Sequence, residues 1–156
     1  MGAEDRLQAL GYRLPPAPSP VGAYVPTRKA SSFLFVSGQI SRSPEKFYRG
    51  KIGTELSLEE GEEAARLCAL NILAQAKAEL GNLDRIQGVV RLAGYLQCSP
   101  GFMDHPRVLN AASELLVQVL GERGKHARVA IGVDSLPLGA AVEVEALFQL
   151  EEGNSP

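Results

Sequence analysis

Alternating apolar and polar positions predict five β-strands along this chain. The strands are expected at residues 21–27, at 31–40, at 85–98 and as a pair within residues 124–148. Pro26 favours an edge position for the first strand, because proline cannot donate a backbone hydrogen bond. The last two strands are joined by a turn around Pro137 and Leu138.

An apolar period close to 3.6 residues predicts the helices. The longest begins after Ser57, which stands three residues before a glutamate in a capping box, and ends at Gly81. A second helix is capped by Asp104 and stopped by Gly121. A shorter helix is expected over residues 3–11, before a proline-rich lead-in.

The resulting order is ββαβαββ. Two long helices cannot cover both faces of such a sheet, so we expect them to lie together on one face. This predicts an α+β two-layer sandwich with a mixed β-sheet. We expect a lead-in of helix and prolines at residues 1–19, one domain at 20–150 and a tail at 151–156.

The last two strands carry charged residues inside β-branched segments. In the first, positions 129, 131 and 133 are β-branched and share one face, while Arg128, Ala130 and Gly132 share the other. In the second, Glu143 and Glu145 lie opposite the apolar face. We expect Arg128 and the glutamates to share the sheet face that the helices leave uncovered. That face is too apolar for plain solvent, which predicts a subunit interface with clefts at its edges.

Composition narrows the classes of function. Of the 156 residues, 45% are hydrophobic and 22% charged, with a net charge of -2. That balance lacks the excess of positive charge that is typical of a nucleic-acid-binding domain. The two cysteines, Cys68 and Cys98, have no metal-ligand spacing and read as reduced thiols of a cytoplasmic protein. No apolar run is long enough to predict a membrane span.

Four blocks of sequence resemble the Rid family of reactive intermediate deaminases, also called the YjgF or L-PSP family. The blocks are VGAYV at 21–25, FLFVSGQI at 33–40, RVLNAASELL at 107–116 and HARVAIGV with LPLGAAVEVEA across 126–146. The resemblance implies a chorismate-mutase-like fold and a homotrimer with ligand clefts between subunits. It also implies hydrolysis of small enamines and imines, such as 2-aminoacrylate, to a 2-keto acid and ammonia, without a metal or organic cofactor.

The resemblance also implies which residues form the site. Arg128 matches the arginine that grips the substrate carboxylate, and Glu143 matches a glutamate that orients or activates water. The implied substrate-binding residues are Tyr24, Ser37, Gly38, Asn110 and Ala130. His126 lies two residues before Arg128 and is a candidate proton shuttle, since histidine titrates near neutral pH.

Three departures from the family archetype bear on activity. Ala130 stands where the archetype has a cysteine, although its backbone N–H could still contact a ligand. Ala23 replaces a proline before Tyr24, and extra residues occur at the N-terminus and in the loops. The chain therefore resembles a longer subgroup of the family.

Each charged residue also has a structural interpretation. Arg128 could form an ion pair with Glu143 or Glu145 across an interface, instead of holding a ligand. If the last two strands form a simple hairpin, Arg128 lies about 13 Å from Glu143 by strand rise. We therefore expect the two to meet only across a subunit boundary or through a water chain.

Three functions remain open from the sequence. The first is a hydrolytic imine or enamine deaminase. The second is a trimeric module that binds small carboxylates or keto acids without turnover. The third is an endoribonuclease or translation inhibitor, which the acidic balance and the absence of paired histidines disfavour.

Overall fold

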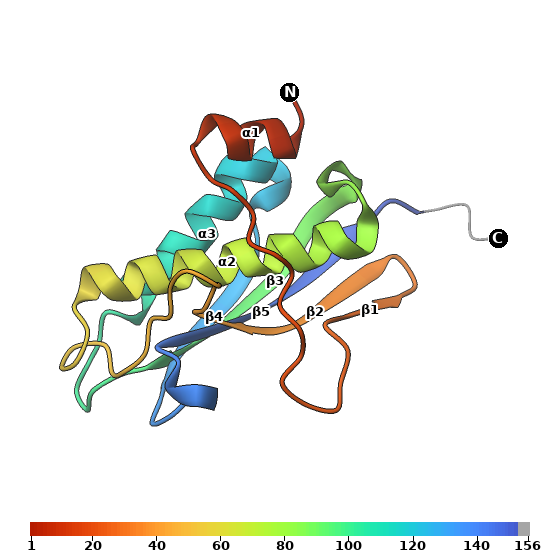
Figure 1. The fold of residues 1–156 in the computed structure, drawn as a ribbon. Helices are drawn as coiled ribbons and strands as arrows, with labels where there is room; N and C mark the ends of the chain where they lie inside the picture. Colours follow the sequence, from red (N-terminus) through yellow and green to blue (C-terminus); the bar gives the residue numbers. More distant parts are fainter. Residues whose placement is uncertain (153–156) are drawn as a thin grey trace.

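The computed structural model describes residues 1–152 and shows two layers, a five-stranded sheet and the helices that cover one of its faces (Figure 1). The predicted α+β class and two-layer architecture are confirmed. The strands are β1 (Thr27–Ala30), β2 (Phe33–Ile40), β3 (Ile86–Gln97), β4 (Ala127–Val133) and β5 (Val142–Leu150). The α-helices are α1 (Ala3–Ala9), α2 (Leu58–Leu80) and α3 (His105–Leu120). Residues 153–156 of the expected tail lie outside the described residues.

Local signals of the sequence set the limits of the long helices. Ser57 accepts a hydrogen bond from the Glu60 backbone N–H and forms the predicted capping box. Gly81 ends α2 in the left-handed conformation, with a φ of 80°. Asp104 holds the N-cap position of α3 but makes no side-chain capping hydrogen bond, so that part of the expectation is wrong.

The order of strands in the sheet is β1-β2-β5-β3-β4. β5 pairs antiparallel with both β2 and β3, whereas β4 pairs parallel with β3 at the edge. The predicted hairpin between the last two strands is therefore wrong, because β3 lies between them. The chain from β4 to β5 passes over the end of β3, and its short 3-10 turn spans Pro137–Gly139.

The first predicted strand is also misplaced. Residues 21–26 form no strand, and β1 begins at Thr27. Pro26 has no N–H to donate, although its carbonyl accepts a hydrogen bond from the Ser37 N–H at 2.9 Å. The extended chain before β1 crosses the end of β2 instead of lengthening the sheet.

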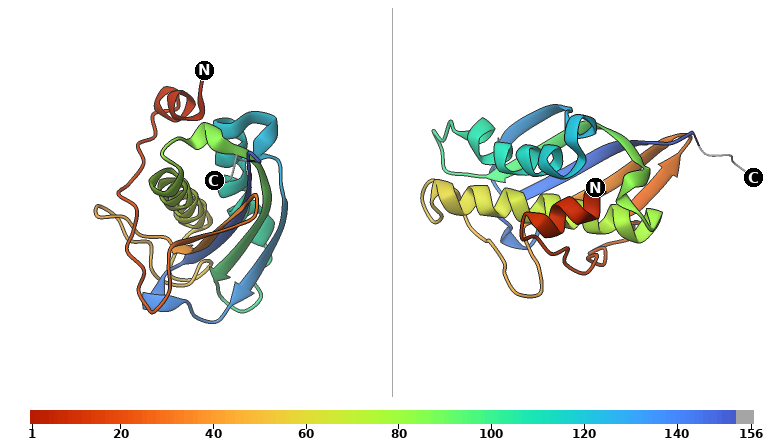
Figure 2. Two further views of the ribbon diagram at one scale, coloured as in Figure 1. Left: turned by 90° about the vertical axis from the view of Figure 1, so that its right-hand side faces the viewer. Right: turned by 90° about the horizontal axis from the view of Figure 1, so that it is seen from above.

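The core lies between the sheet and the pair formed by α2 and α3 (Figure 2). Leu92, Leu96, Val144 and Phe148 face the helices and are buried. Ala3 and Leu7 of α1 extend this core over α3. A register shift in β3 between Val89 and Arg91 buries Val89 and leaves Val90 exposed, although simple alternation would place Val90 on the same face as the buried Leu92.

The two faces of β4 are also the reverse of those expected. Arg128 pairs with Leu92, and Ala130 pairs with Gly94, so both point to the face that the helices cover. The small residues admit α3, because a Cβ added to Gly132 would lie 2.7 Å from His105 Nε2. The uncovered face instead carries the β-branched residues of β4, together with Arg91, Tyr95, Glu143 and Glu145 as expected.

Candidate functional site

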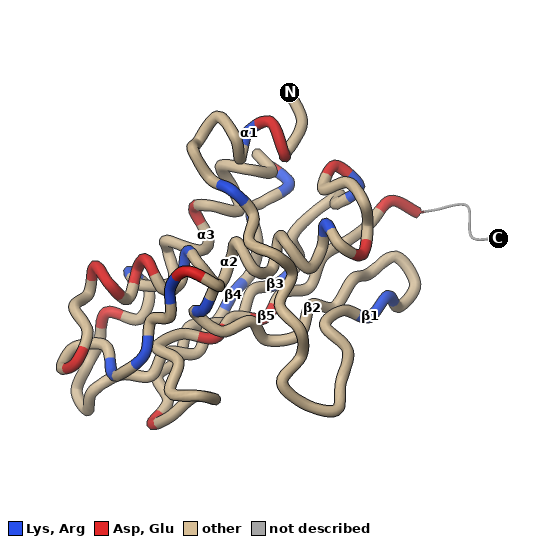
Figure 3. The backbone as a smooth tube through the Cα atoms, viewed as in Figure 1, with Lys and Arg blue, Asp and Glu red and all other residues tan. Residues whose placement is uncertain are grey.

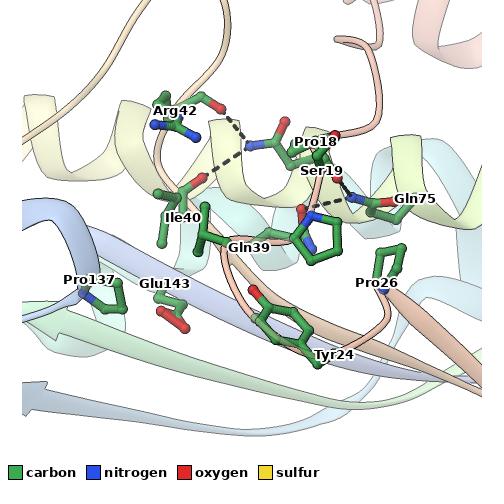
Figure 4. Close-up of a pocket in the computed structure, with 14 residues that line it drawn as sticks. Pro18, Ser19, Tyr24, Pro26, Gln39, Ile40, Arg42, Gln75, Pro137 and Glu143 are labelled. Carbon is green, nitrogen blue, oxygen red and sulfur yellow. Dashed lines mark hydrogen bonds between the residues drawn. The ribbon is translucent and has the colours of Figure 1, made fainter.

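A pocket lies beside the last residues of β2, where β1 no longer covers that strand. β1 pairs only with the stretch from Phe33 to Val36, so the outer edge of β2 is free of β1 beyond it. The coil before β1 crosses this edge and closes a cavity of about 60 Å³, a volume suited to a few waters or a small ligand (Figure 4). Its lining residues are Pro18, Ser19, Pro20, Val21, Tyr24, Pro26, Gly38, Gln39, Ile40, Arg42, Asn71, Gln75, Pro137 and Glu143.

A β-bulge brings Glu143 into this pocket. The register between β2 and β5 shifts between Val36 and Gln39, which places an extra residue in β2. Gly38 lies in this bulge, and a Cβ added there would stand 2.5 Å from Glu143 Oε1. Only glycine therefore lets the Glu143 side chain cross the strand in its present position.

The environment of Glu143 favours its protonated form. Burial raises the pKa of the Glu143 carboxyl, and the negative charge of Glu145 two residues along β5 raises it further. A carboxyl group whose pKa is shifted toward neutrality exchanges protons more readily in general acid–base chemistry.

Polar side chains of α2 close the helix side of the pocket. Asn71 is 1% exposed and donates from Nδ2 to the carbonyls of Ile40 and Arg42, at 3.0 and 2.8 Å. Gln75 donates to the Pro18 carbonyl at 2.6 Å and to Gln39 Oε1 at 3.3 Å. Asn71 and Gln75 therefore hold the end of β2 and the crossing coil in place.

Neither amide was among the residues that sequence analysis singled out. Their signal was available: two amides four residues apart interrupt the apolar stripe of a helix that is otherwise rich in alanine and leucine. Asn71 Oδ1 is the one buried side-chain oxygen or nitrogen within residues 1–152 that has no hydrogen-bond partner.

A second polar cluster joins β4 to α3 at the far edge of the sheet. Arg128 donates from Nη1 to Ser113 Oγ at 3.0 Å and from Nη2 to the Pro106 carbonyl at 3.1 Å. The His126 ring places Nε2 2.9 Å from the same Ser113 Oγ and Nδ1 2.6 Å from the Gly124 carbonyl. Helical spacing places Asn110, which is exposed, between Pro106 and Ser113 on one side of α3.

The two clusters do not meet within one protomer. Arg128 pairs with Leu92, which faces the helices, whereas Glu143 pairs with Tyr95 on the opposite face. β3 separates their strands, so the backbones stand about 10 Å apart across the sheet and are also offset along it. The placement of Arg128 beside the glutamates on the uncovered face is therefore wrong.

The other expected residues are divided between these places. Tyr24 and Gly38 line the pocket with Glu143. Ser37 donates to the Val25 carbonyl at 2.7 Å and lines a separate hollow on the uncovered face, beside Arg91 and Glu145. Ala130 packs against the core below Arg128.

His105, the first residue of α3, lies close to a cysteine. Its Nε2 stands 3.6 Å from Cys98 Sγ, next to Gly132. Burial raises the pKa of the Cys98 thiol, which opposes formation of the nucleophilic thiolate. This thiol therefore does not replace the one that the archetype carries at the position of Ala130.

Within residues 1–152, no three His, Cys, Asp or Glu side chains are grouped closely enough to hold a metal ion. In the same range, no helix combines the length and the apolar character that a bilayer crossing requires.

Comparison with known proteins gives this architecture a family. Residues 4–150 match the family model described as YjgF/chorismate mutase-like, putative endoribonuclease. Protein TCP17 of Trypanosoma cruzi is 44% identical over 146 residues, which cover 92% of this chain and 91% of that protein.

Solved structures agree with this match. The protein Atu1372 of Agrobacterium tumefaciens, described as having unknown function, is 40% identical with a TM-score of 0.88, over 96% of this chain and 94% of that one. RidA from an Antarctic Psychrobacter is 30% identical with a TM-score of 0.60, over 86% and 94% of the two chains. The chain belongs to the Rid/YjgF family.

Proposed function

We propose that this protein is a hydrolytic deaminase of small reactive enamines and imines, and that it works as a homotrimer. The observation that carries the proposal is Glu143, a carboxyl of raised pKa that lines a small pocket, where a Cβ at Gly38 would stand 2.5 Å from its Oε1 atom. The guanidinium of Arg128 is planar and can pair with a carboxylate through two hydrogen bonds. In this proposal, Arg128 of another subunit binds the substrate carboxylate.

The proposed chemistry needs few groups. Glu143 accepts a proton from water as the water oxygen bonds to the imine carbon, and the pair of electrons in the C=N bond moves to nitrogen. Glu143 then passes this proton to the nitrogen, which leaves as ammonia. The hydroxyl proton returns to Glu143 as the carbon–oxygen double bond of the 2-keto acid forms. Because a protonated imine is already electrophilic, positioning and proton transfer supply most of the acceleration.

Apolar side chains on the uncovered sheet face support an assembly of several copies. Phe35 is 49% exposed, Val129 37% and Ile131 42%, although each lies in a strand. Such side chains on one sheet face are typical of a protein–protein interface. β4 also presents its free edge there, so a partner subunit docked at this edge can bring its own pocket to Arg128.

One observation favours a second candidate, a trimer that binds small carboxylates without turnover. Ala130 has no thiol and packs against the core, so this region offers one fewer reactive group than the family archetype. A nuclease reading finds less support, because acidic and basic positions are interspersed along the chain (Figure 3).

The test is release of ammonia and keto acid from freshly generated 2-aminoacrylate by the purified protein. We expect turnover that is lost in Glu143→Gln and Arg128→Ala and retained in Glu145→Gln. Saturable keto-acid binding without turnover would support the binding module, and full activity of Arg128→Ala would refute the proposed clamp.

A further inference from the structure

Arg42 adds a cation to the pocket that holds Glu143. It lies two residues after the end of β2 and is one of the lining residues. In Figure 4, Arg42, Ile40 and Glu143 lie at one end of the pocket, and Gln75 and Pro26 lie at the other. Its guanidinium carbon stands 5.5 Å from the centre of the Phe47 ring.

Arg49 approaches the same ring. Its guanidinium carbon stands 5.1 Å from the centre of Phe47, so this aromatic ring supports both guanidinium groups. The site is thus a pair of arginines arranged around Phe47, with Arg42 on the pocket wall.

Apart from the Phe47 ring, neither guanidinium has a charged or hydrogen-bonded partner among the described residues. Among residues 1–152, the ion pairs engage other lysines and arginines, and neither Arg42 nor Arg49 donates a side-chain hydrogen bond. Arg128, in contrast, donates two such bonds within its own protomer. A guanidinium that lines a pocket and has no carboxylate partner is available to pair with a bound anion.

The backbone holds this pair in place. Asn71 bonds the Arg42 carbonyl at 2.8 Å, and Arg42 forms an isolated β-bridge with Phe47. Arg49 forms a second bridge with Ala140, and the Gly50 N–H donates to the Gly139 carbonyl at 3.0 Å. The loop is therefore attached to the Pro137–Gly139 turn, whose Pro137 also lines the pocket.

We propose that Arg42, with Arg49 beside it, forms a second anion-binding subsite, so that the pocket selects small acids carrying a further anionic group. This inference rests on the proposed function, because it takes the Glu143 pocket as the substrate site and Arg128 of the partner subunit as the clamp for the first carboxylate. The second group is a carboxylate or a phosphate, since a guanidinium pairs bidentately with either.

Glu143 lines the same pocket from β5, and its negative charge would oppose a second anion. Burial and Glu145 raise the pKa of the Glu143 carboxyl, which lessens its negative charge as the pH falls. The competing explanation is that both arginines only stack on Phe47 in a solvated loop.

The experiment measures dissociation constants of keto acids in matched pairs by calorimetry, on the whole protein. Oxaloacetate, 2-oxoglutarate and 2-oxoadipate are compared with 2-oxobutanoate and 2-oxopentanoate, and phosphoenolpyruvate tests the phosphate. We expect at least one dianion to bind about tenfold more tightly than the monocarboxylates, as an added charge-assisted hydrogen-bonded pair provides. Whether the tightest dianion carries a second carboxylate or a phosphate identifies the group.

Variants then assign the preference to Arg42. Arg42→Gln should weaken the preferred dianion about tenfold and the monocarboxylates much less. Lys46→Met is the matched control, because Lys46 lies 4.9 Å over the Tyr48 ring and does not line the pocket. It should leave both affinities unchanged.

Equal affinity for monoanions and dianions overturns the proposal, as does a preference that survives Arg42→Gln or the absence of binding by every acid. Failure of the proposed function is distinguishable from these results. Turnover of 2-aminoacrylate without a dianion preference would refute only the subsite, and a dianion preference without any turnover would refute only the deaminase.

Discussion

The Arg128 edge and the Glu143 pocket are two polar regions of one sheet that treat their charges in opposite ways. The Arg128 guanidinium is oriented by two hydrogen bonds that it donates to α3, one to Ser113 Oγ and one to the Pro106 carbonyl. Glu143 is partly buried beside another carboxylate, and within residues 1–152 no side-chain hydrogen bond compensates its charge. The Arg128 guanidinium is thus held in one orientation, whereas the Glu143 carboxyl lies where its charged form is disfavoured.

The contrast shows how a site can be divided between two edges of a fold. A guanidinium fixed by neutral acceptors keeps its full charge and remains ready for an anion. A carboxyl pushed toward its neutral form is suited to proton transfer. Since β3 and the thickness of the sheet separate the two within a protomer, we expect them to be joined by a second copy of the chain.

The largest effects are expected when Arg128 and Glu143 are each replaced and the two variants are then mixed in one oligomer. Arg128→Ala and Glu143→Gln should each lower kcat/KM by about 10²–10⁴-fold, because one loses the substrate clamp and the other the base. If the two residues meet across subunits, co-refolded mixtures of the two variants should regain about a quarter of wild-type sites. Deaminase activity of each variant and of the mixture is the measurement.

The mixture has a clear contrary outcome. Activity that stays at the level of the separate variants, in mixed oligomers verified by mass, would place both residues in one protomer or refute one of the roles.

Gly38→Ala tests how the pocket admits its carboxyl group. The new methyl group would lie 2.5 Å from Glu143 Oε1, so the side chain must move, and activity should fall about tenfold or more. Gly88→Ala is the matched control in another strand, because its nearest neighbours would lie 3.9 Å away. If both variants keep wild-type kcat/KM, the position of Glu143 is not decisive for catalysis.

Ser113→Ala tests the orientation of Arg128. The change removes the hydroxyl that contacts both Arg128 and His126. We expect KM to rise about three- to tenfold, as the loss of one hydrogen bond implies, with a smaller change in kcat. Ser113→Thr retains a hydroxyl and should recover most of the affinity, whereas an equal loss in Thr and Ala variants would point to packing.

The smallest expected effect concerns stability and pH. Because folding raises the pKa of the Glu143 carboxyl, the folded state binds this proton more tightly than the unfolded state does. The Glu143 carboxyl therefore contributes most to the free energy of unfolding at a pH below its pKa in the unfolded state. This contribution is lost as the pH rises through its pKa in the folded state. Glu143→Gln should be more stable than wild type at pH 8, by less than about 1 kcal/mol given the partial exposure of the group.

Urea unfolding of both proteins at pH 4 and pH 8 measures this difference. The gain should shrink toward pH 4, where the wild-type carboxyl is largely protonated when folded and increasingly protonated when unfolded. A gain that is the same at both pH values would show that the charge is not its cause.

Much of the fold could be predicted from the sequence because its signals are local. Ser57 and Gly81 mark the ends of α2 through capping geometry that depends on a few neighbouring residues. Strand alternation likewise gave the order of the main elements. The family resemblance then named Glu143, Gly38 and Tyr24, which the fold brings to one pocket.

Alternation could not decide strand partners or which side of a strand faces the core. β5 pairs with β3, more than forty residues back in the chain, and a one-residue bulge exchanges the faces of Val89 and Val90. Arg128 faces the helices because Ala130 and Gly132 are small enough to let α3 approach, which no pattern within β4 reveals.

The sequence by itself thus determined the helices, most strands and the residue types of the site, since propensity, capping and side-chain period act over a few residues. Only the tertiary structure decided that Glu143 and Arg128 lie on opposite faces, and that Asn71, Gln75 and Arg42 join the pocket. Those outcomes depend on contacts between segments far apart in the chain, where packing and register, rather than local preference, set the geometry.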